Sequence, residues 1–344
     1  MLAAIVVGLG GVELGLRAFV PSSGAGSAAR FELDPELIYR LRAENVVTWS
    51  SPEFTEISHT NALGLRGGEV AAKQAGELRI LAVGDSFTYG HGVQDDEAYP
   101  AVVETMLRAR GHDVQVLNAG VPGYNTDQAY TWTLRDGLAL APDLVLVGVH
   151  CSDVSDNYES SLYDLDGDRL VRRAVERTRM YRLGSLVGLI PRVVRTSRTF
   201  DVLVASLDWY DAPSARPVVP DLDAWSFRKI RLEVADLARR AAARDTAVAV
   251  VLMPCKKSLA PGARDPYGPL VADLSAARVP VLASGAALAG VEQDHDLRAL
   301  FFRDDPHLNP DGNRALAHAV ADFVESAGLV VMPSQVMAIR APSG

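Results

Sequence analysis

Five short runs of aliphatic and β-branched residues alternate along the chain with longer stretches of helical period. The apolar runs are residues 78–83, 114–117, 144–149, 247–253 and 279–283, and the stretches predicted as helices are residues 99–110, 126–140, 223–244, 269–277 and 310–326. Strands that are buried on both faces are apolar throughout, so this alternation is typical of a parallel sheet covered by helices. The sequence therefore predicts an α/β protein with a five-stranded parallel sheet.

Composition narrows the class of protein further. The 344 residues are 48% hydrophobic and carry 34 Lys and Arg against 43 Asp and Glu, a net charge of −9. This balance excludes a disordered chain and a rod, and it disfavours a general nucleic-acid binder. The two cysteines, Cys151 and Cys255, form no CxxC motif. They follow the third and fourth predicted strands, so a disulfide is possible, but two buried thiols are the favoured interpretation.

The first twenty residues are apolar apart from Glu13 and Arg17. Residues 2–20 are just long enough to cross a bilayer, whereas the uninterrupted apolar run 2–12 has the length of a secretion-signal core. The run also resembles the beginning of a GxGxxG dinucleotide-binding turn, but Glu13 stands where the third glycine belongs. We favour a membrane anchor or uncleaved signal, with a cleaved signal and a core strand as the alternatives.

The predicted organisation has an anchor or signal at 1–20, a membrane-proximal lead segment at 21–76, a catalytic domain at 77–330 and a tail at 331–344. Residues 157–222 interrupt the alternation and form an insertion within that domain. Within it, residues 169–198 carry nine arginines and one acidic residue, Glu176. A basic segment of this kind suits contact with anionic lipid or a lid over an acyl substrate. A solvated helical hairpin is the alternative.

The sequence GDSFTYG, residues 84–90, follows the first predicted strand directly. In an open parallel sheet, ligands bind outside the carboxyl ends of the strands, so Ser86 is expected at the rim of a site. A helix cap or a turn is the structural alternative for this serine, because Ser and Asp favour both.

A second polar segment, DDPHLNP, covers residues 304–310. His307 can accept a serine proton as a general base, and a carboxylate three residues earlier, Asp304, can hold its other ring nitrogen. The structural alternative is a helix-start cap, since Asn309 and Pro310 also favour a helix start. A serine and an Asp/His pair that both lie in loops at strand ends are harder to explain by chance.

Taken together, GDSFTYG, NAGVPGYNT (residues 118–126) and DPHLNPDGN (residues 305–313) resemble the three blocks of the SGNH/GDSL hydrolase superfamily. NALGLRG (residues 61–67) and residues 142–157 resemble segments of its bacterial envelope-associated members. The resemblance implies a three-layer α/β/α, flavodoxin-like fold and a serine hydrolase that acts on ester bonds without a cofactor. It also implies a location in the bacterial cell envelope, anchored at the N-terminus and facing outward, or secretion.

The resemblance assigns roles to individual residues. Ser86 is the implied nucleophile and His307 the base, with Asp304 favoured over Asp305 as the orienting acid because of the spacing of three. The implied oxyanion hole comprises the backbone N–H groups of Ser86 and Gly123 and an asparagine side chain, but this sequence has Ser152 at the asparagine position. Candidates to replace that amide are Asn125, His150 and Asn157.

Further residues near the motifs are candidates for contact with a substrate: Asp85, Tyr89, Tyr124, Asn125 and Asp153. Asp85 is also suited to fixing its own loop, and the tyrosines to packing. No metal is expected, because His150, Cys151 and Asp153 are nearly consecutive and rarely converge on one ion. The acidic turn at 164–168 lacks the glutamate of a calcium loop at its twelfth position, where Val175 stands.

The resemblance thus implies an ester hydrolase that works through an acyl-Ser86 intermediate on an O-acyl glycan or a lipid. The expected partners are this small-molecule, glycan or lipid ester and a membrane surface, without nucleic acid. Two alternatives stay open. A glycan- or lipid-binding module with weakened catalysis is suggested by Ser152, and an O-acyltransferase would use the same three residues.

Overall fold

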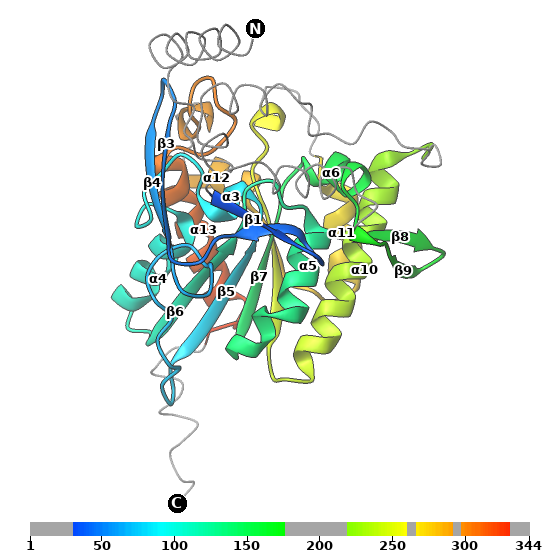
Figure 1. Ribbon diagram of the computed structural model, residues 1–344, viewed down its shortest axis with the longest axis horizontal. Coiled ribbons are helices and arrows are strands. Elements are labelled where there is room, and N and C mark those ends of the chain that lie inside the picture. Colours follow the sequence, from blue (N-terminus) through cyan, green and yellow to red (C-terminus); the bar gives the residue numbers. More distant parts are fainter. Residues whose placement is uncertain (1–29, 176–218, 260–265, 292–296, 331–344) are drawn as a thin grey trace, which may run out of the picture.

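The computed structural model describes residues 30–175, 219–259, 266–291 and 297–330 (Figure 1). Its centre is a five-stranded parallel sheet in the order β6-β5-β7-β10-β11. The strands are β5 (Leu78–Gly84), β6 (Val114–Gly120), β7 (Leu144–Val149), β10 (Ala247–Leu252) and β11 (Val281–Ala283). This is the predicted flavodoxin-like order, and the five predicted apolar runs are confirmed as its strands.

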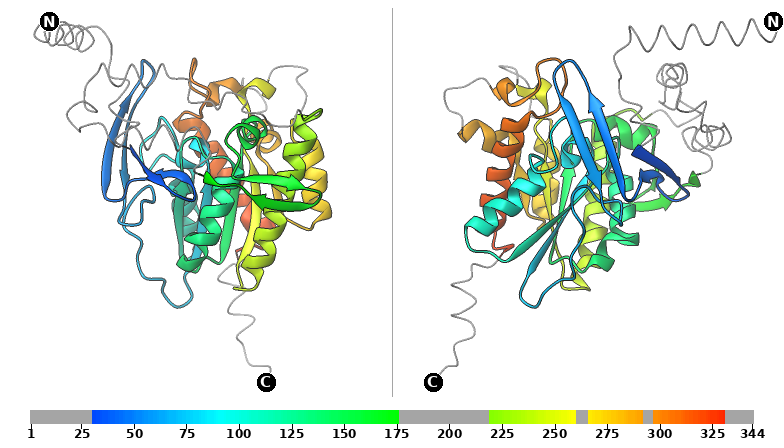
Figure 2. Two further views of the ribbon diagram at one scale, coloured as in Figure 1. Left: turned by 45° about the vertical axis from the view of Figure 1, so that its right-hand side comes forward. Right: turned by 60° about the vertical axis from the view of Figure 1, so that its left-hand side comes forward.

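Helices cover both faces of the sheet (Figures 1 and 2). One face carries α4 (Tyr99–Ala109), α12 (Ser284–Val291) and α13 (Pro310–Ser326), and the other carries α5 (Thr126–Arg135), α10 (Leu222–Ala242) and α11 (Gly268–Ala276). Along β5, Ile80 faces the first layer and Leu81 the second, because successive side chains of a strand point to opposite faces. The result is the predicted three-layer α/β/α fold.

Short elements complete the described chain. They are the helices α3 (Ser86–Tyr89) and α6 (Asp153–Glu159), the hairpin strands β8 (Tyr163–Asp166) and β9 (Arg169–Arg172), and the 3₁₀ turns η1 (Gly137–Leu140), η3 (Lys256–Leu259) and η4 (Leu297–Leu300). The predicted helix over 126–140 is thus α5 followed by a 3₁₀ turn.

The lead segment folds into two antiparallel hairpins that the sequence did not predict. They are β1 (Phe31–Asp34) with β2 (Ile38–Leu41), and β3 (Asn45–Ser50) with β4 (Thr55–Thr60). The segment joins the edge strand β6, where the Arg66 N–H donates to the Asn118 carbonyl at 3.0 Å. Leu37 and Leu41 pack against Tyr89 just beyond the end of β5. The lead segment therefore covers the sheet edge beside the carboxyl end of β5.

Three sequence predictions fall wholly or partly outside the described residues: the anchor at 1–20, most of the basic insertion (176–218) and the tail from 331. Among the helices that the structure does describe, none combines the length and the hydropathy needed to cross a membrane.

Candidate active site

Ser86 lies directly after β5, at the start of the short helix α3. Asp85 caps this helix, because its Oδ1 accepts the Phe87 N–H at 2.9 Å, and Gly90 ends it in the left-handed conformation. Ser86 is the first helical residue, so its N–H has no acceptor within the helix. The turn thus presents the Ser86 hydroxyl together with a backbone N–H that has no acceptor in the described part of the chain.

Two residues far apart in sequence fix the position of α3. A Cβ atom at Gly120 would lie 2.2 Å from the Tyr89 nitrogen, so only glycine lets α3 sit this close to β6. The buried guanidinium of Arg66 donates to the Tyr89 and Gly90 carbonyls at 2.7 and 2.6 Å, and to the Val93 carbonyl at 2.6 Å. These contacts give the NALGLRG segment a structural role.

The loop before α13 brings His307 to Ser86. The His307 Nε2 lies 2.8 Å from the Ser86 Oγ, and Nδ1 lies 2.6 Å from the Asp305 Oδ1. The same Asp305 oxygen accepts the His307 backbone N–H at 2.9 Å. Burial raises the pKa of Asp305, but the hydrogen bonds and charge of His307 together outweigh burial, and the pKa is lowered overall. The carboxylate is therefore ionised at neutral pH and can stabilise an imidazolium.

Asp304, the favoured acid in the sequence analysis, does not contact His307. Its carboxylate pairs with Arg303 at 2.7 Å, and the two side chains are 69% and 86% exposed. The spacing of three favoured Asp304, but residues 303–307 form a bend. In that bend a carboxylate two residues before the histidine meets both its backbone N–H and its ring. Asp305 therefore holds the position assigned to Asp304.

A second histidine lies beside the triad. The His91 ring is 4.7 Å from the His307 ring, and its Nδ1 is 3.2 Å from Oε2 of the fully buried Glu56. Burial lowers the pKa of His91 and so favours its neutral form. Burial raises the pKa of Glu56, but His91 and Arg30, whose guanidinium lies 2.9 Å away, outweigh it and lower the pKa to about 2. The His91–Glu56 pair thus packs against the His307 ring through the ring of His91.

Gly123, which the resemblance implies as an oxyanion donor, lies at a backbone position that favours glycine. Its φ of +80° is strained for other residues, and a Cβ there would lie 2.7 Å from the Tyr39 hydroxyl. Within the described residues its N–H has no acceptor. Its role as an oxyanion donor stays a prediction, as does that of the Ser86 N–H.

The structure leaves the third oxyanion donor open. The Ser152 hydroxyl lies 3.0 Å from the His150 Nδ1, a contact that engages it with that ring. Asn125 caps α5 through Gln128, and Asn157 bonds to Thr126. The third suggested substitute, His150, stacks on Phe87, the residue after Ser86, with ring centroids 4.1 Å apart. Burial lowers the pKa of His150 to about 3, so the ring is neutral.

The five residues suggested for substrate contact are buried: Asp85, Tyr89, Tyr124, Asn125 and Asp153 are each 6% exposed or less. Their contacts are internal. Tyr89 lies against the Arg66 guanidinium, 4.3 Å from the ring centroid, and the Tyr124 hydroxyl donates to the Tyr39 carbonyl. Burial raises the pKa of Asp85 to about 6 and that of Asp153 well above its usual range. In this structure these residues contact the protein's own groups, and their contact with a substrate stays a prediction.

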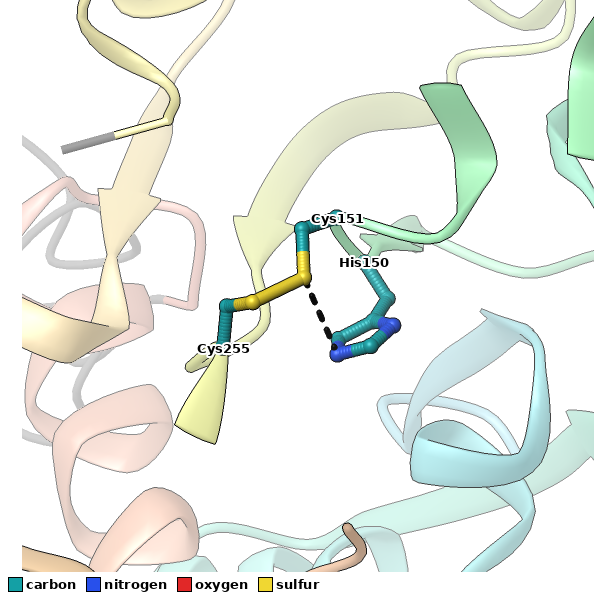
Figure 3. Close-up of side chains that lie close together, drawn as sticks. All are labelled: His150, Cys151 and Cys255. Carbon is teal, nitrogen blue, oxygen red and sulfur yellow. Dashed lines mark hydrogen bonds between the residues drawn. A yellow bond between two sulfur atoms is a disulfide. The ribbon is translucent and has the colours of Figure 1, made fainter. Parts of the chain in front are cut away.

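Cys151 and Cys255 form a disulfide between the ends of β7 and β10, with Cα atoms 6.1 Å apart (Figure 3). The favoured interpretation, two buried thiols, is wrong. The two sulfurs and the His150 Nε2 lie close enough to hold a metal, but joined sulfurs are not thiolates. His91, Asp305 and His307 also lie close together, but the last two are engaged with each other in the triad. No described group is thus a free set of metal ligands.

Asp305 was the less favoured acid in the sequence analysis, and the roles of Arg66 and of the His91–Glu56 pair were not predicted. Asp305 carried a signal, because Asp two residues before a histidine readily accepts its backbone N–H. Glu56 carried none, since it lies in a segment with no predicted structure.

A parallel sheet with helices on both faces, and a Ser–His–Asp chain at its carboxyl edge, define a hydrolase of the α/β/α class. The profile of the GDSL-like lipase/acylhydrolase family matches residues 82–315. The chain belongs to this family and is an ester-hydrolysing enzyme.

Several solved structures are similar to this chain at low sequence identity. TesA is 14% identical, with 73% of this chain and 99% of that one covered and a TM-score of 0.44. Axe2, an acetylxylan esterase from Geobacillus stearothermophilus, is 15% identical, with 72% and 94% covered and a TM-score of 0.44. LAE5, an α/β hydrolase from the metagenome of Lake Arreo, Spain, is 17% identical, with 74% and 96% covered and a TM-score of 0.44. Among curated proteins, none matches.

Proposed function

We propose that the enzyme cleaves O-acyl esters of an envelope glycan or lipid through an acyl-Ser86 intermediate. The observation that carries this proposal is the hydrogen-bonded chain from Asp305 through His307 to Ser86, with contacts of 2.6 and 2.8 Å. A serine activated by a histidine whose second nitrogen is held by a carboxylate is the arrangement that nucleophilic acyl transfer requires.

In the proposed acylation step, the Ser86 Oγ attacks the ester carbonyl and its proton passes to the His307 Nε2. The carbonyl oxygen becomes an anion and accepts hydrogen bonds from the Ser86 and Gly123 N–H groups. The intermediate collapses to the acyl-enzyme, and the imidazolium returns the proton to the departing alcohol. Water then repeats the sequence and releases the acid. Asp305 stays ionised throughout and stabilises the imidazolium in both halves.

The engaged hydroxyl of Ser152 sustains a second candidate, a glycan- or lipid-binding module with weakened catalysis. Loss of one oxyanion donor typically lowers the rate by about 10²–10³-fold. An O-acyltransferase is the third candidate, because a sugar hydroxyl in place of water uses the same residues.

Covalent labelling with a fluorophosphonate separates the enzyme from the binding module. We expect the wild type and the control Ser275→Ala, an exposed serine on α11, to be labelled and Ser86→Ala to be unlabelled. A folded wild type that does not label would refute the hydrolase proposal. Turnover of p-nitrophenyl esters of increasing chain length then ranks the acyl group, and added glycan acceptors distinguish transfer from hydrolysis.

We also propose that the enzyme is exported and works at the bacterial cell envelope, where its partner is an ester substrate or a membrane surface and not a nucleic acid. The Cys151–Cys255 disulfide supports export, because disulfides persist in oxidising compartments. The apolar residues 1–20 support an anchor or signal. A fusion of residues 1–30 to a reporter that is active only outside the cytoplasm tests this. An inactive but stable fusion would refute it.

A further inference from the structure

The loop that carries Asp305 is held by a carboxylate from the lead segment. Glu53 lies in the turn between β3 and β4, and its two oxygens accept three consecutive backbone N–H groups. Oε1 accepts from Arg303 at 2.7 Å, and Oε2 accepts from Asp304 at 3.0 Å and from Asp305 at 2.9 Å. Figures 1 and 2 show the tip of this hairpin beside the segment that precedes α13.

An ammonium group holds the same loop through its carbonyl groups. Lys256 Nζ donates to the carbonyls of Phe302, Arg303 and Asp305 at 2.5, 2.7 and 3.1 Å. Lys256 begins η3 directly after Cys255, so the disulfide to Cys151 anchors the point from which this side chain extends. The loop thus donates three hydrogen bonds to Glu53 and accepts three from Lys256, two side chains of opposite charge.

The hairpin also contacts the catalytic ring indirectly. The Phe54 ring lies 4.6 Å from the Phe302 ring and 5.4 Å from the His91 ring, and His91 in turn contacts His307. Hydrogen bonds from the N–H groups of Glu53 and Phe54 to the Ser51 Oγ, both at 3.2 Å, shape the turn that presents these side chains. The turn is therefore built to meet the loop.

We propose that Glu53 and Lys256 are positioning residues of the triad, and that they clamp the loop so that Asp305 meets the His307 Nδ1. The inference rests on the proposed function, since it assigns Asp305 the role of orienting acid. Catalytic groups must be held within about 0.5 Å of their productive geometry, and a short polar loop without regular structure does not achieve this alone. The β3–β4 hairpin is then part of the active site, although the family profile begins at residue 82.

Variants of Glu53 test the carboxylate side of the clamp. We expect Glu53→Ala to lower kcat by about 10–100-fold with KM changed less than about twofold, because the triad and not substrate binding is disturbed. Glu53→Gln keeps one acceptor oxygen and is expected to lose less. Glu69→Ala is the matched control, since this exposed carboxylate accepts a single backbone N–H, that of Ala62, within the lead segment. An unchanged kcat in folded Glu53→Ala would overturn the proposal.

Variants of Lys256 test the ammonium side. We expect Lys256→Met to lower kcat in the same way and Lys257→Met, at the exposed neighbouring lysine, to leave it unchanged. Equal effects of the two substitutions would overturn the role of Lys256, because they would trace the loss to charge alone.

A double-mutant cycle separates positioning from general stabilisation. If Glu53 acts through Asp305, then Glu53→Ala added to Asp305→Ala lowers kcat by less than about twofold further, because coupled residues are not additive. Rates are taken per active site, counted by fluorophosphonate labelling. An additive loss would show a merely structural role and overturn the proposal.

A spectroscopic readout keeps the clamp testable without turnover. The proton between the His307 Nδ1 and Asp305 is expected to give a far-downfield NMR resonance in the wild type and Glu69→Ala, and to weaken or shift in Glu53→Ala. If the wild type neither labels nor turns over esters, the proposed function fails, and the NMR comparison still decides the clamp. A resonance that is the same in all three proteins would overturn the clamp.

Discussion

Asp305 and Asp304 are neighbours in the chain, but only Asp305 contacts His307. We therefore expect Asp305→Ala to lower the rate of ester hydrolysis strongly and Asp304→Ala to change it little. Asp305 is bonded to the His307 Nδ1 at 2.6 Å and its side chain is 25% exposed. Asp304 is 69% exposed and pairs with an exposed arginine. The comparison is well matched, because both variants remove one carboxylate from the same loop.

The magnitude follows from the charge separation. Opposite charges about 4 Å apart interact by about 4 kcal/mol at an effective dielectric constant near 20. The imidazolium forms only as the reaction proceeds, so this stabilisation acts on the transition state, and its loss corresponds to roughly a thousandfold in rate. We therefore expect Asp305→Ala to lower kcat/KM by about 10³–10⁴-fold, in line with the loss of a triad carboxylate elsewhere. Asp304→Ala is expected to change it by less than about threefold, since exposed ion pairs contribute little.

The assay is p-nitrophenyl acetate hydrolysis, with active sites counted by fluorophosphonate labelling and folding checked by circular dichroism. A loss in Asp304→Ala that equals or exceeds that in Asp305→Ala would refute the assignment of the acid. A loss below about tenfold in folded Asp305→Ala would refute the electrostatic reasoning itself.

Three further substitutions probe the groups around the site. The pKa of Glu56 is about 2 in the fold against 4.5 for an unperturbed glutamate, so its ionised form stabilises the fold above about pH 4.5, and this stability is lost as the pH falls toward 2. Between pH 5 and pH 2 we expect the free energy of unfolding, measured in urea, to fall by about 3 kcal/mol less in Glu56→Gln than in the wild type. An equal fall in both proteins would contradict this. Arg66→Lys cannot reproduce the fork of hydrogen bonds and is expected to lower the free energy of unfolding by about 2–3 kcal/mol, whereas a value below about 0.5 kcal/mol would refute its role. In the wild type, the Lys229 Nζ lies 2.7 Å from the Oδ2 of the fully buried Asp127. Lys229→Met leaves this carboxylate without its counter-ion and is expected to lower the free energy of unfolding by about 3–5 kcal/mol. The control is Lys257→Met, at an exposed lysine. Equal stability of these two variants would argue against a buried ion pair.

The strands and helices of the sheet domain were predictable because their burial is uniform. The apolar runs that become β7 and β10 lie in the interior on both faces, so hydrophobicity alone marks them. The motif residues Ser86, Gly123 and His307 were also predictable, since each stands at the end of a strand or the start of a helix in a recognisable block.

The lead segment was not predictable, because its pattern of burial is inverted. In β4, Glu56 and Ser58 are buried while Ile57 is 43% exposed, and in β3, Val46 is 61% exposed. The alternation of apolar and polar residues therefore predicts that the wrong face of the hairpin is buried. The Glu56 carboxylate can be buried because partners far along the chain, such as Arg30, stabilise its charge. Contacts of this kind join residues far apart in the chain and leave no local signal.

The orienting acid could not be chosen from spacing, because spacing implies a backbone geometry. Three residues suit a helix, whereas Asp305 and His307 lie in a bend where a separation of two brings carboxylate and ring together. The shape of the bend depends on Glu53 and Lys256, which lie about 250 and 50 residues away along the chain.

The disulfide gives the chain a second covalent connection between Cys151 and Cys255, besides the backbone that joins them. Cleavage of any one peptide bond in that interval would place Ser86 on one fragment and His307 on the other, yet the two fragments would remain a single covalent molecule. The whole basic insertion, residues 157–222, lies inside this interval. A cut within it would therefore leave the fragment that carries the nucleophile covalently joined to the fragment that carries its base.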